Sequence, residues 1–473
     1  MTINTLEDDI LLGVFNSCRL ANEDAWNNRI GWQKLSHVCR RWRHLIYQSA
    51  FHLGIHILCT EGAPVVTALD HLPPRLPLII DYQCEGNSFA PVDVRRNDAL
   101  GLYQALRLHD RVRHIELHLQ PSTLHIPIIL MDKPFPILEH LSLLVVHDGI
   151  TTLTLLTTFL APNLRRLTLS GICLPKRLRL LTSTVSLSTL ALLDIPASGY
   201  FRPRLLMARL QSLPQLEELS IGFSVPIPRP SAERELLGKQ GTPVTLLKIF
   251  EYQGVSAYLE RLISQMRAPL LDQLQITLFN QIAFTLPHLT YFVNRAEQIK
   301  LHAVMVSFQR YGVSIASDFS YASWDKPFVL RVRCKPLDWQ IDCMEQICSA
   351  FTPILSGVDK LTLHFEQIEM PTEWQVDGTT WQQLLRSFFG VEELLIDYEL
   401  AKELSRALDV NEIGSDPGFL PGLQRITYNV KLSEDRLFDS FIQARQLAGR
   451  PISVTREHPL SRGLFGPRSP ISS

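Results

Sequence analysis

The feature that most constrains how this chain can fold is a short apolar pattern that recurs twelve times. Each occurrence places apolar residues at positions 1, 4 and 6 of a six-residue stretch, and successive occurrences begin 23 to 33 residues apart. A period of this length is typical of solenoid proteins, in which each unit buries its apolar side only by stacking on its neighbours. The stretches begin at Val112, Leu138, Leu164, Leu187, Leu216, Val244, Leu271, Ala296, Val329, Val358, Val391 and Leu423. The starts at Val244, Ala296 and Val329 fit the pattern least well.

Each repeat is predicted to hold one strand and one helix. The apolar pattern itself predicts the strand, and a proline precedes many of these strands, as at Pro162, Pro214 and Pro269. Proline ends a helix and favours extended chain after it. Helices are predicted over 204–213, 257–266, 344–354, 381–389 and 434–447. We therefore expect an α/β fold in which a short helical region precedes a leucine-rich-repeat-like β/α solenoid of about twelve repeats. A (β/α) barrel also alternates strand and helix and remains the alternative.

The N-terminus carries two short amphipathic helical patterns. Apolar residues recur at helical spacing in each, while Arg40, Arg41 and Arg43 fall on the opposite side of the second. Two helices this short give each other too little cover to be stable alone, so part of their apolar surface is expected to belong to a partner. The apolar residues are Ile10, Leu11, Val14 and Phe15 in the first pattern and Leu35, Val38, Cys39, Trp42, Leu45 and Ile46 in the second.

This order of residues resembles an F-box. The resemblance rests on Leu6 with an acidic pair and Ile-Leu-x-x-Val-Phe, then Leu-x-x-Val-Cys-Arg-x-Trp-Arg-x-Leu; the family's usual Leu-Pro start is Leu6-Glu7 here. The continuation over 58–82 is similar to the F-box-like families of mushroom-forming fungi. F-box proteins bind the Skp adaptor of SCF-type cullin-RING ubiquitin ligases, and the rest of the chain selects the client.

The resemblance therefore implies a substrate-recognition subunit of an SCF-type ubiquitin ligase, joined to a cullin through a Skp-type adaptor. The residues that it assigns to adaptor binding are Leu6, Ile10, Leu11, Val14, Phe15, Leu35, Val38, Cys39 and Trp42. A repeat scaffold whose F-box-like segment serves only as a packed N-terminal cap is the second hypothesis. A hydrolase built on a barrel is the third.

The expected organisation has four parts: F-box helices over 1–50, a connecting segment with the first strands over 51–111, repeats over 112–457, and a disordered tail over 458–473. The net charge of −1 gives no general attraction to nucleic acid or to anionic membranes. The eight scattered cysteines form no CxxC pair and indicate reduced thiols. With no signal-peptide pattern and no long apolar run, a cytoplasmic or nuclear protein is expected.

A basic patch is predicted on the concave face of the repeats. In a leucine-rich strand, positions 3, 5 and 7 line that face, and the rungs that begin at Ala296, Val329 and Val358 carry no acid at these positions. Neighbouring rungs lie about 4.8 Å apart, so their cations would share one surface suited to an acidic or phosphorylated client. The predicted client-binding residues are Lys300, His302, Arg331, Arg333, Lys335, Lys360 and His364.

No pattern in the sequence predicts catalysis or a cofactor. His114, Glu116 and His118 alternate on one strand, but they do not form HExxH, and a polar trio facing solvent is the simpler interpretation. His37, Cys39 and His44 are read as a core thiol with surface imidazoles, and Cys343 and Cys348 as buried small apolar residues. We therefore expect no enzyme, no metal and no cofactor.

Overall fold

The structure is a computed structural model. It describes residues 6–21, 31–50, 52–83, 92–119, 133–145, 159–173, 181, 183–226, 242–244, 246–296, 298–317, 326–366, 378–408, 416, 419–429 and 437–457. The chain divides into two compact units. The first contains Met1–Phe201 with Ser212–Leu216, and the second contains Arg202–Gln211 with Glu217–Ser473.

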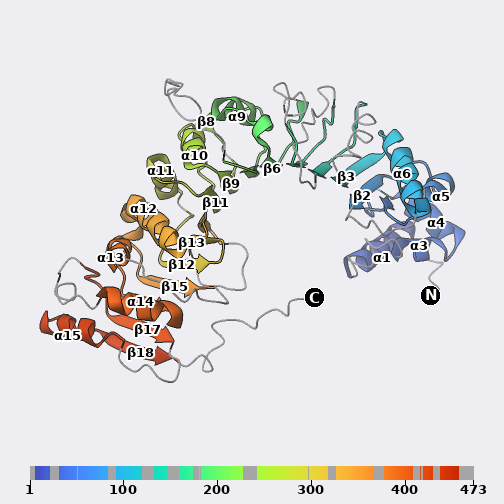
Figure 1. The fold of residues 1–473 in the computed structure, drawn as a ribbon. Helices are drawn as coiled ribbons and strands as arrows, with labels where there is room; N and C mark the ends of the chain where they lie inside the picture. The colour runs from blue at the N-terminus through green and yellow to red at the C-terminus, as the bar shows by residue number, and fades with distance from the viewer. Residues whose placement is uncertain are drawn as a thin grey trace. The chain divides into compact units, whose positions relative to one another are not determined.

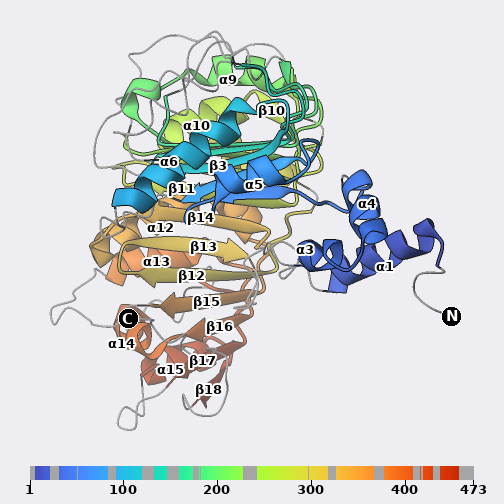
Figure 2. The same ribbon diagram turned by 90° about the vertical axis from the view of Figure 1, so that its right-hand side faces the viewer.

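The first unit begins with three helices. They are α1 (Asp8–Ala21), α3 (Gly31–Ser36) and α4 (Arg40–Gln48). The acidic residues Asp8 and Asp9 occupy the first turn of α1, where they favour the partial positive charge of a helix N-terminus. In Figures 1 and 2 the three helices lie next to one another at the blue end of the chain.

The rest of the first unit is a run of parallel strands. Strands β1 (Ile57–Thr60), β2 (Leu78–Gln83), β3 (Val112–Leu119), β4 (His140–Val145), β5 (Arg166–Ser170) and β6 (Thr189–Ile195) pair in chain order. Helices α5 (Val65–His71) and α6 (Val92–Arg107) connect the first three strands. The core-facing leucines of β5, Leu167 and Leu169, are at most 2% exposed. Position 4 and 6 residues therefore form a continuous apolar core along the run.

The second unit repeats this plan, and in its described residues six of the nine connections between consecutive main-series strands contain a helix. Its strands pair in the order β7-β9-β11-β14-β13-β12-β15-β16-β17-β18. Figure 1 shows the helices of this unit on one side of its strands. The strands are β7 (Glu218–Phe223), β9 (Ile249–Gly254), β11 (Gln273–Phe279), β12 (Ala303–Gln309), β13 (Gly312–Ser317), β14 (Phe328–Arg333), β15 (Lys360–Phe365), β16 (Glu393–Ile396), β17 (Arg425–Asn429) and β18 (Ser453–Glu457). The helices are α9 (Pro203–Leu210), α10 (Ser256–Ile263), α11 (Pro287–Arg295), α12 (Leu337–Leu355), α13 (Gly378–Arg386), α14 (Tyr398–Leu408) and α15 (Asp439–Leu447), and a two-residue pair, β8 (Thr242–Pro243) with β10 (Met266–Arg267), lies outside the main series.

One element breaks the order of the second unit. Strands β12, β13 and β14 form an antiparallel meander, so β14 pairs with β11 while β12 pairs with β15. Gly312 opens β13 after a two-residue turn, and a Cβ atom there would collide with the carbonyl oxygen of Val332 on β14. The close approach of these two strands therefore depends on glycine at this position. The sequence pattern did not predict this hairpin.

The predicted repeat register is confirmed for nine of the twelve starts and wrong for the other three. Phe250 pairs with Leu274, which sets the start of its repeat at Leu247 instead of Val244. Val304 pairs with Leu361, which moves the next start from Ala296 to Leu301. Phe328, not Val332, pairs with Leu274 and takes position 4 in β14, so the Val329 start is four residues late. In stretches this rich in apolar residues, a 1-4-6 pattern fits more than one frame.

The predicted helices match the observed ones better in position than in length. All five predicted helices overlap observed ones, while α5, α6, α11 and α14 were not predicted. Helix α12 begins at Leu337, before the predicted start at 344. In the described residues neither unit's strand order closes on itself, so the barrel alternative is wrong. The architecture is a mixed α/β repeat dominated by parallel strands. The predicted tail, 458–473, lies outside the described residues.

Candidate functional site

The three N-terminal helices have a small core of their own. Phe15 of α1 meets Trp42 of α4 edge to face, with ring centroids 4.9 Å apart and planes 66° apart. Leu11 of α1 and Leu45 and Ile46 of α4 are buried as well, each at most 7% exposed. An edge-to-face aromatic pair adds about 0.5–1.5 kcal/mol beyond the area that it buries. The core therefore consists of few residues gathered around one aromatic pair.

Two polar contacts fix α4 in place. The Arg41 guanidinium donates to the Asp8 carboxylate at 2.6 Å and to the backbone carbonyl oxygen of Leu6, which ties α4 to the start of α1. Cys39 is the N-cap of α4, and its Sγ accepts from the backbone N–H of Trp42 at 3.4 Å. Sequence reasoning placed Arg41 only on the polar side of the helix; its pairing with Asp8 could not be read from helical spacing.

The structure divides the nine predicted adaptor-binding residues into three groups. Ile10, Val14 and Val38 are 51%, 41% and 58% exposed, which is high for apolar side chains in a segment that has a core of its own. Leu6, Leu35 and Cys39 are half-buried. Leu11, Phe15 and Trp42 are buried. The last three support the exposed surface from within instead of forming it, which corrects the expectation that all nine would face a partner.

The prediction that the client patch lies on three consecutive rungs is wrong. β14, which carries Arg331 and Arg333, is separated by β13 from β12. Lys300 and His302 precede β12 and lie outside its strand register. The pairings Arg331–Ser314, Ser314–Ser307 and Ser307–His364 place two serine-bearing strands between Arg331 and His364. At about 4.8 Å per strand, this row separates the two cationic residues by roughly 14 Å.

The cations of the predicted patch also differ in how they are held. Lys360 forms an ion pair with Glu393 at 3.0 Å, and His364 Nδ1 lies 2.6 Å from the carboxylate of Asp397. Arg333 donates to Gln253 at 2.7 Å and lies over the Phe279 ring. Lys335 lies over the Tyr311 ring, with its Nζ 5.8 Å from the ring centroid. Arg331 and Arg333 on β14 are exposed, and so is Lys335 just after this strand. Lys300 and His302 are exposed before β12.

The polar trio on β3 shares one face as the alternation predicts. His114 and His118 each lie 3.6 Å from Glu116, and all three are half-buried instead of fully exposed. His114 also stacks on His140 of β4, with ring centroids 4.1 Å apart. Burial, together with the neighbouring His114, lowers the pKa of His140 to about 4, and burial also lowers the pKa of His114. Both rings are therefore neutral near pH 7.

The parts of the chain described above contain no group of three or more His, Cys, Asp or Glu residues arranged to hold a metal ion. None of their helices is long and apolar enough to cross a bilayer. Within these residues, the arrangement offers surfaces for contact and no assembled metal centre.

Comparisons with known proteins give a likeness among solved structures alone. No family model and no curated protein matches this chain. Among solved structures, the leucine-rich repeat-containing protein LegL7 from Legionella pneumophila is 12% identical, and the match covers 84% of this chain and 99% of that one with a TM-score of 0.25. A TM-score this low identifies no family, so the description of a leucine-rich-repeat-like region rests on the strand and helix order given above.

Proposed function

We propose that this chain is the substrate-recognition subunit of an SCF-type ubiquitin ligase. In this proposal helices α1, α3 and α4 bind a Skp-type adaptor and the repeats bind a client protein. The chain itself performs no covalent chemistry; it raises the effective concentration of the client near the ligase. The F-box resemblance of the N-terminal sequence supports the first part, and a repeat built of stacked strands and helices supports the second.

The single observation that carries the proposal is the exposure of Ile10, Val14 and Val38. These three side chains are apolar, they come from both halves of the F-box-like pattern, and each is more than 40% exposed. Isolated exposed apolar residues are ordinary on protein surfaces. Here the exposed residues are among the positions that the F-box resemblance assigns to adaptor binding. Their exposure is therefore what an adaptor-binding surface requires.

The second hypothesis, a repeat scaffold with the helices as a structural cap, predicts a different burial pattern. A cap is stable because its apolar face packs on the first repeat. The buried residues Phe15 and Trp42 instead pack on each other across α1 and α4, while Ile10, Val14 and Val38 remain exposed within the same unit. This pattern favours the docking interpretation.

The client is proposed to present acidic or phosphorylated side chains to the exposed cations of β14. Arg331 and Arg333 are both exposed, and guanidinium groups bind carboxylate and phosphate bidentately. Charge contacts of this kind weaken as salt rises, because the Debye length is only about 8 Å at physiological ionic strength. Reversal of both residues to Glu is expected to release the client and leave adaptor binding intact.

Adaptor capture tests the proposal. The full chain is immobilised and incubated with a purified Skp-type adaptor, alone and with its cullin. The proposal expects the adaptor to be retained and the cullin to be retained only when the adaptor is present. If neither protein is retained at micromolar concentration while the repeats are folded by circular dichroism, the scaffold hypothesis replaces this one.

A further inference from the structure

A hollow beside α4 has a charge that the adaptor proposal does not explain. Its volume is 990 Å³, and it lies between α4, the turn before β2 and the turns before β3 and β4, all in the first unit. The residues that line it are Arg40, Arg43, His44, Tyr47, Gln48, Ala50, Pro73, Arg75, Pro77, Asp110, Arg111 and Ile137. Four arginines and one histidine therefore surround the hollow with a single carboxylate.

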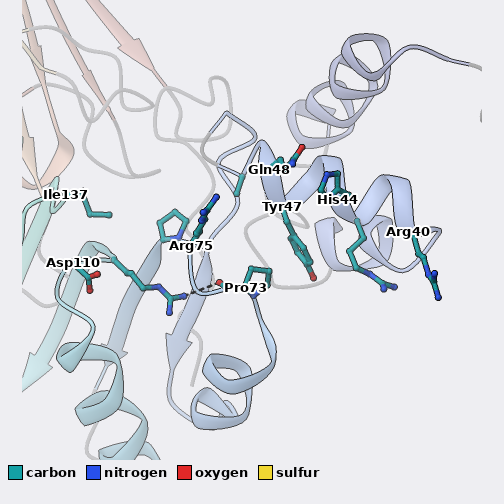
Figure 3. A pocket seen from close by; sticks show the side chains of 12 residues that line it. Arg40, His44, Tyr47, Gln48, Pro73, Arg75, Asp110 and Ile137 are labelled. Atoms are coloured by element: carbon teal, nitrogen blue, oxygen red, sulfur yellow. Dashed lines mark hydrogen bonds between the residues drawn. The ribbon is translucent and has the colours of Figure 1, made fainter.

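The α4 wall follows directly from helical spacing. Arg40, His44 and Tyr47 recur at intervals of four and three residues, which places them on one side of the helix. Trp42 and Ile46 are buried on the other side. Figure 3 shows Arg40, His44 and Tyr47 in succession along α4, with the Tyr47 side chain pointing toward Pro73.

The opposite wall is held rigidly by one of its arginines. Arg111 donates through Nε and Nη2 to the backbone carbonyl oxygen of Leu76 at 3.1 and 3.0 Å, which fixes the turn before β2 to the turn before β3. Arg43 donates to the carbonyl oxygen of Ser36 at 2.9 Å. In the part of the chain that the structure describes, Arg40, His44 and Arg75 form no hydrogen bond or ion pair. Two guanidinium groups thus remain available on opposite walls.

We propose that this hollow, defined as the α4 pocket, binds an acidic peptide segment of a protein partner. Its volume is at the upper end of the range for ligand pockets and far exceeds what a single phosphate or carboxylate needs. Its lining combines Arg and Tyr with the exposed apolar side chain of Ile137, a composition typical of the anchor positions in protein interfaces. Carboxylates of the segment pair with Arg40 and Arg75 while its apolar side chains contact Tyr47 and Ile137.

The site is distinct from the exposed cations of β14, which belong to the second unit, and it goes beyond the proposed function because it requires no adaptor. The difference in position provides a matched control. Arg40→Glu/Arg75→Glu and Arg331→Glu/Arg333→Glu each reverse two exposed arginines, so the two variants change the net charge of the chain equally.

Fluorescence anisotropy with a fluorescein-labelled peptide tests the proposal. The probe has the sequence Glu-Glu-Ile-Glu-Glu-Tyr-Glu, and the full chain is titrated at 50 and 200 mM salt. We expect binding that weakens with salt, a loss of at least tenfold for Arg40→Glu/Arg75→Glu, and less than twofold change for Arg331→Glu/Arg333→Glu. A second peptide, in which every Glu of the probe is replaced by Gln, keeps the contacts to Tyr47 and Ile137 but loses the charge pairs, so we expect it to bind more weakly than the acidic probe. Ile137→Asp is expected to reduce the affinity of the chain for the acidic probe.

Three results would overturn the proposal. The first is an unchanged anisotropy of the labelled peptide at the highest concentration of the wild-type chain. The second is equal loss in both arginine variants, or loss in the β14 variant alone, which would place the peptide elsewhere. The third is complete displacement of the peptide by inorganic phosphate at equal concentration, which would reduce the pocket to an anion site without peptide selectivity. Circular dichroism and adaptor capture on the same preparations separate these results from misfolding and from failure of the adaptor proposal.

Discussion

The three N-terminal helices and the repeats differ in how they cover their apolar surface. In the repeats, each apolar stripe is covered by the next strand and helix, and residues such as Leu361 and Leu394 on neighbouring strands are fully buried. The helices instead bury one side on each other and leave Ile10, Val14 and Val38 exposed. A stacked repeat supplies its own cover, whereas a short helical segment can expose apolar surface if a partner completes it. Substitutions in the helices and in the repeats test whether the two regions differ in this way.

The largest expected effect is on the core of the helices. Trp42→Ala removes half of the aromatic pair with Phe15 and is expected to cost about 3–5 kcal/mol. Because the helices have so small a core, this loss should abolish their structure while the repeats stay folded. Hydrogen exchange of α1 and α4, measured against that of β15 and β16, checks it. Simultaneous loss of protection in both regions would show that the helices and the repeats form one cooperative core.

The second prediction concerns the core of the repeats. Leu361→Ala in β15 is expected to lower the free energy of unfolding by about 2–5 kcal/mol, since Leu361 is fully buried between neighbouring strands. Denaturant unfolding measures this effect, with Thr168→Ala as the matched control because Thr168 on β5 is half-buried and faces away from the core. A larger cost for Thr168→Ala than for Leu361→Ala would mean that the register described here is wrong.

The corresponding threonine of β15 requires a correction. Thr362 is position 5 of the rung that begins at Val358, a position expected to line the concave face, yet it is only 7% exposed. Its partners across the sheet are Met305 of β12 and Leu395 of β16, both large apolar residues. Thr362→Ala is therefore not the neutral control that a strand exposed on one face would have provided.

The third prediction is a difference in pH dependence between the two units. The pKa of His140 in the folded protein is about 4, below the usual 6.5, so the unfolded chain binds a proton there more readily than the folded chain does. The stability that His140 contributes is complete above pH 6.5 and falls as the pH drops from about 6.5 toward 4. Hydrogen exchange in β3 and β4 at pH 7 and pH 5 is expected to show lower protection at pH 5, and His140→Asn should reduce that change.

An unchanged pH response in the His140→Asn protein would contradict the role assigned to the stacked His114–His140 pair. Strands β16 and β17 lie in the other unit and provide an internal reference in the same sample. Any change in their exchange protection between pH 7 and pH 5 is compared with the change in β3 and β4.

The smallest effect is expected at the contact between α1 and α4. The Arg41–Asp8 pair is 37% and 57% exposed, and exposed ion pairs contribute only about 0.2–1 kcal/mol. A double-mutant cycle with Arg41→Ala and Asp8→Ala should give a coupling in this range that shrinks at high salt. A coupling well above it would make this contact, and not the Phe15–Trp42 pair, the main support of the helices.

The strand register could be predicted from the sequence where the 1-4-6 apolar pattern fits in only one frame. The strands β5, β7 and β17, which follow the predicted starts Leu164, Leu216 and Leu423, have the expected register. The meander of β12 to β14 escaped prediction because its antiparallel strands carry the same apolar residues as the repeats. The pairings that it creates, β14 with β11 and β12 with β15, join strands that are not neighbours in the chain and leave no local signal. The predicted client patch failed for this reason. The predicted adaptor-binding set could not separate core residues from exposed ones, because Val14 and Phe15 are both apolar and only the structure shows that one is exposed and the other buried.

Adaptor affinity tests the central claim most directly. Val14→Asp places a carboxylate on the exposed surface of α1, where an apolar partner would have to bury it at a cost of several kcal/mol. Val185→Asp is the matched control, since Val185 is 60% exposed in the repeats. Isothermal titration with the purified Skp-type adaptor is expected to show binding to the wild type and to Val185→Asp, and at least a hundredfold weaker binding to Val14→Asp. Equal affinity of all three proteins for the adaptor would contradict the account.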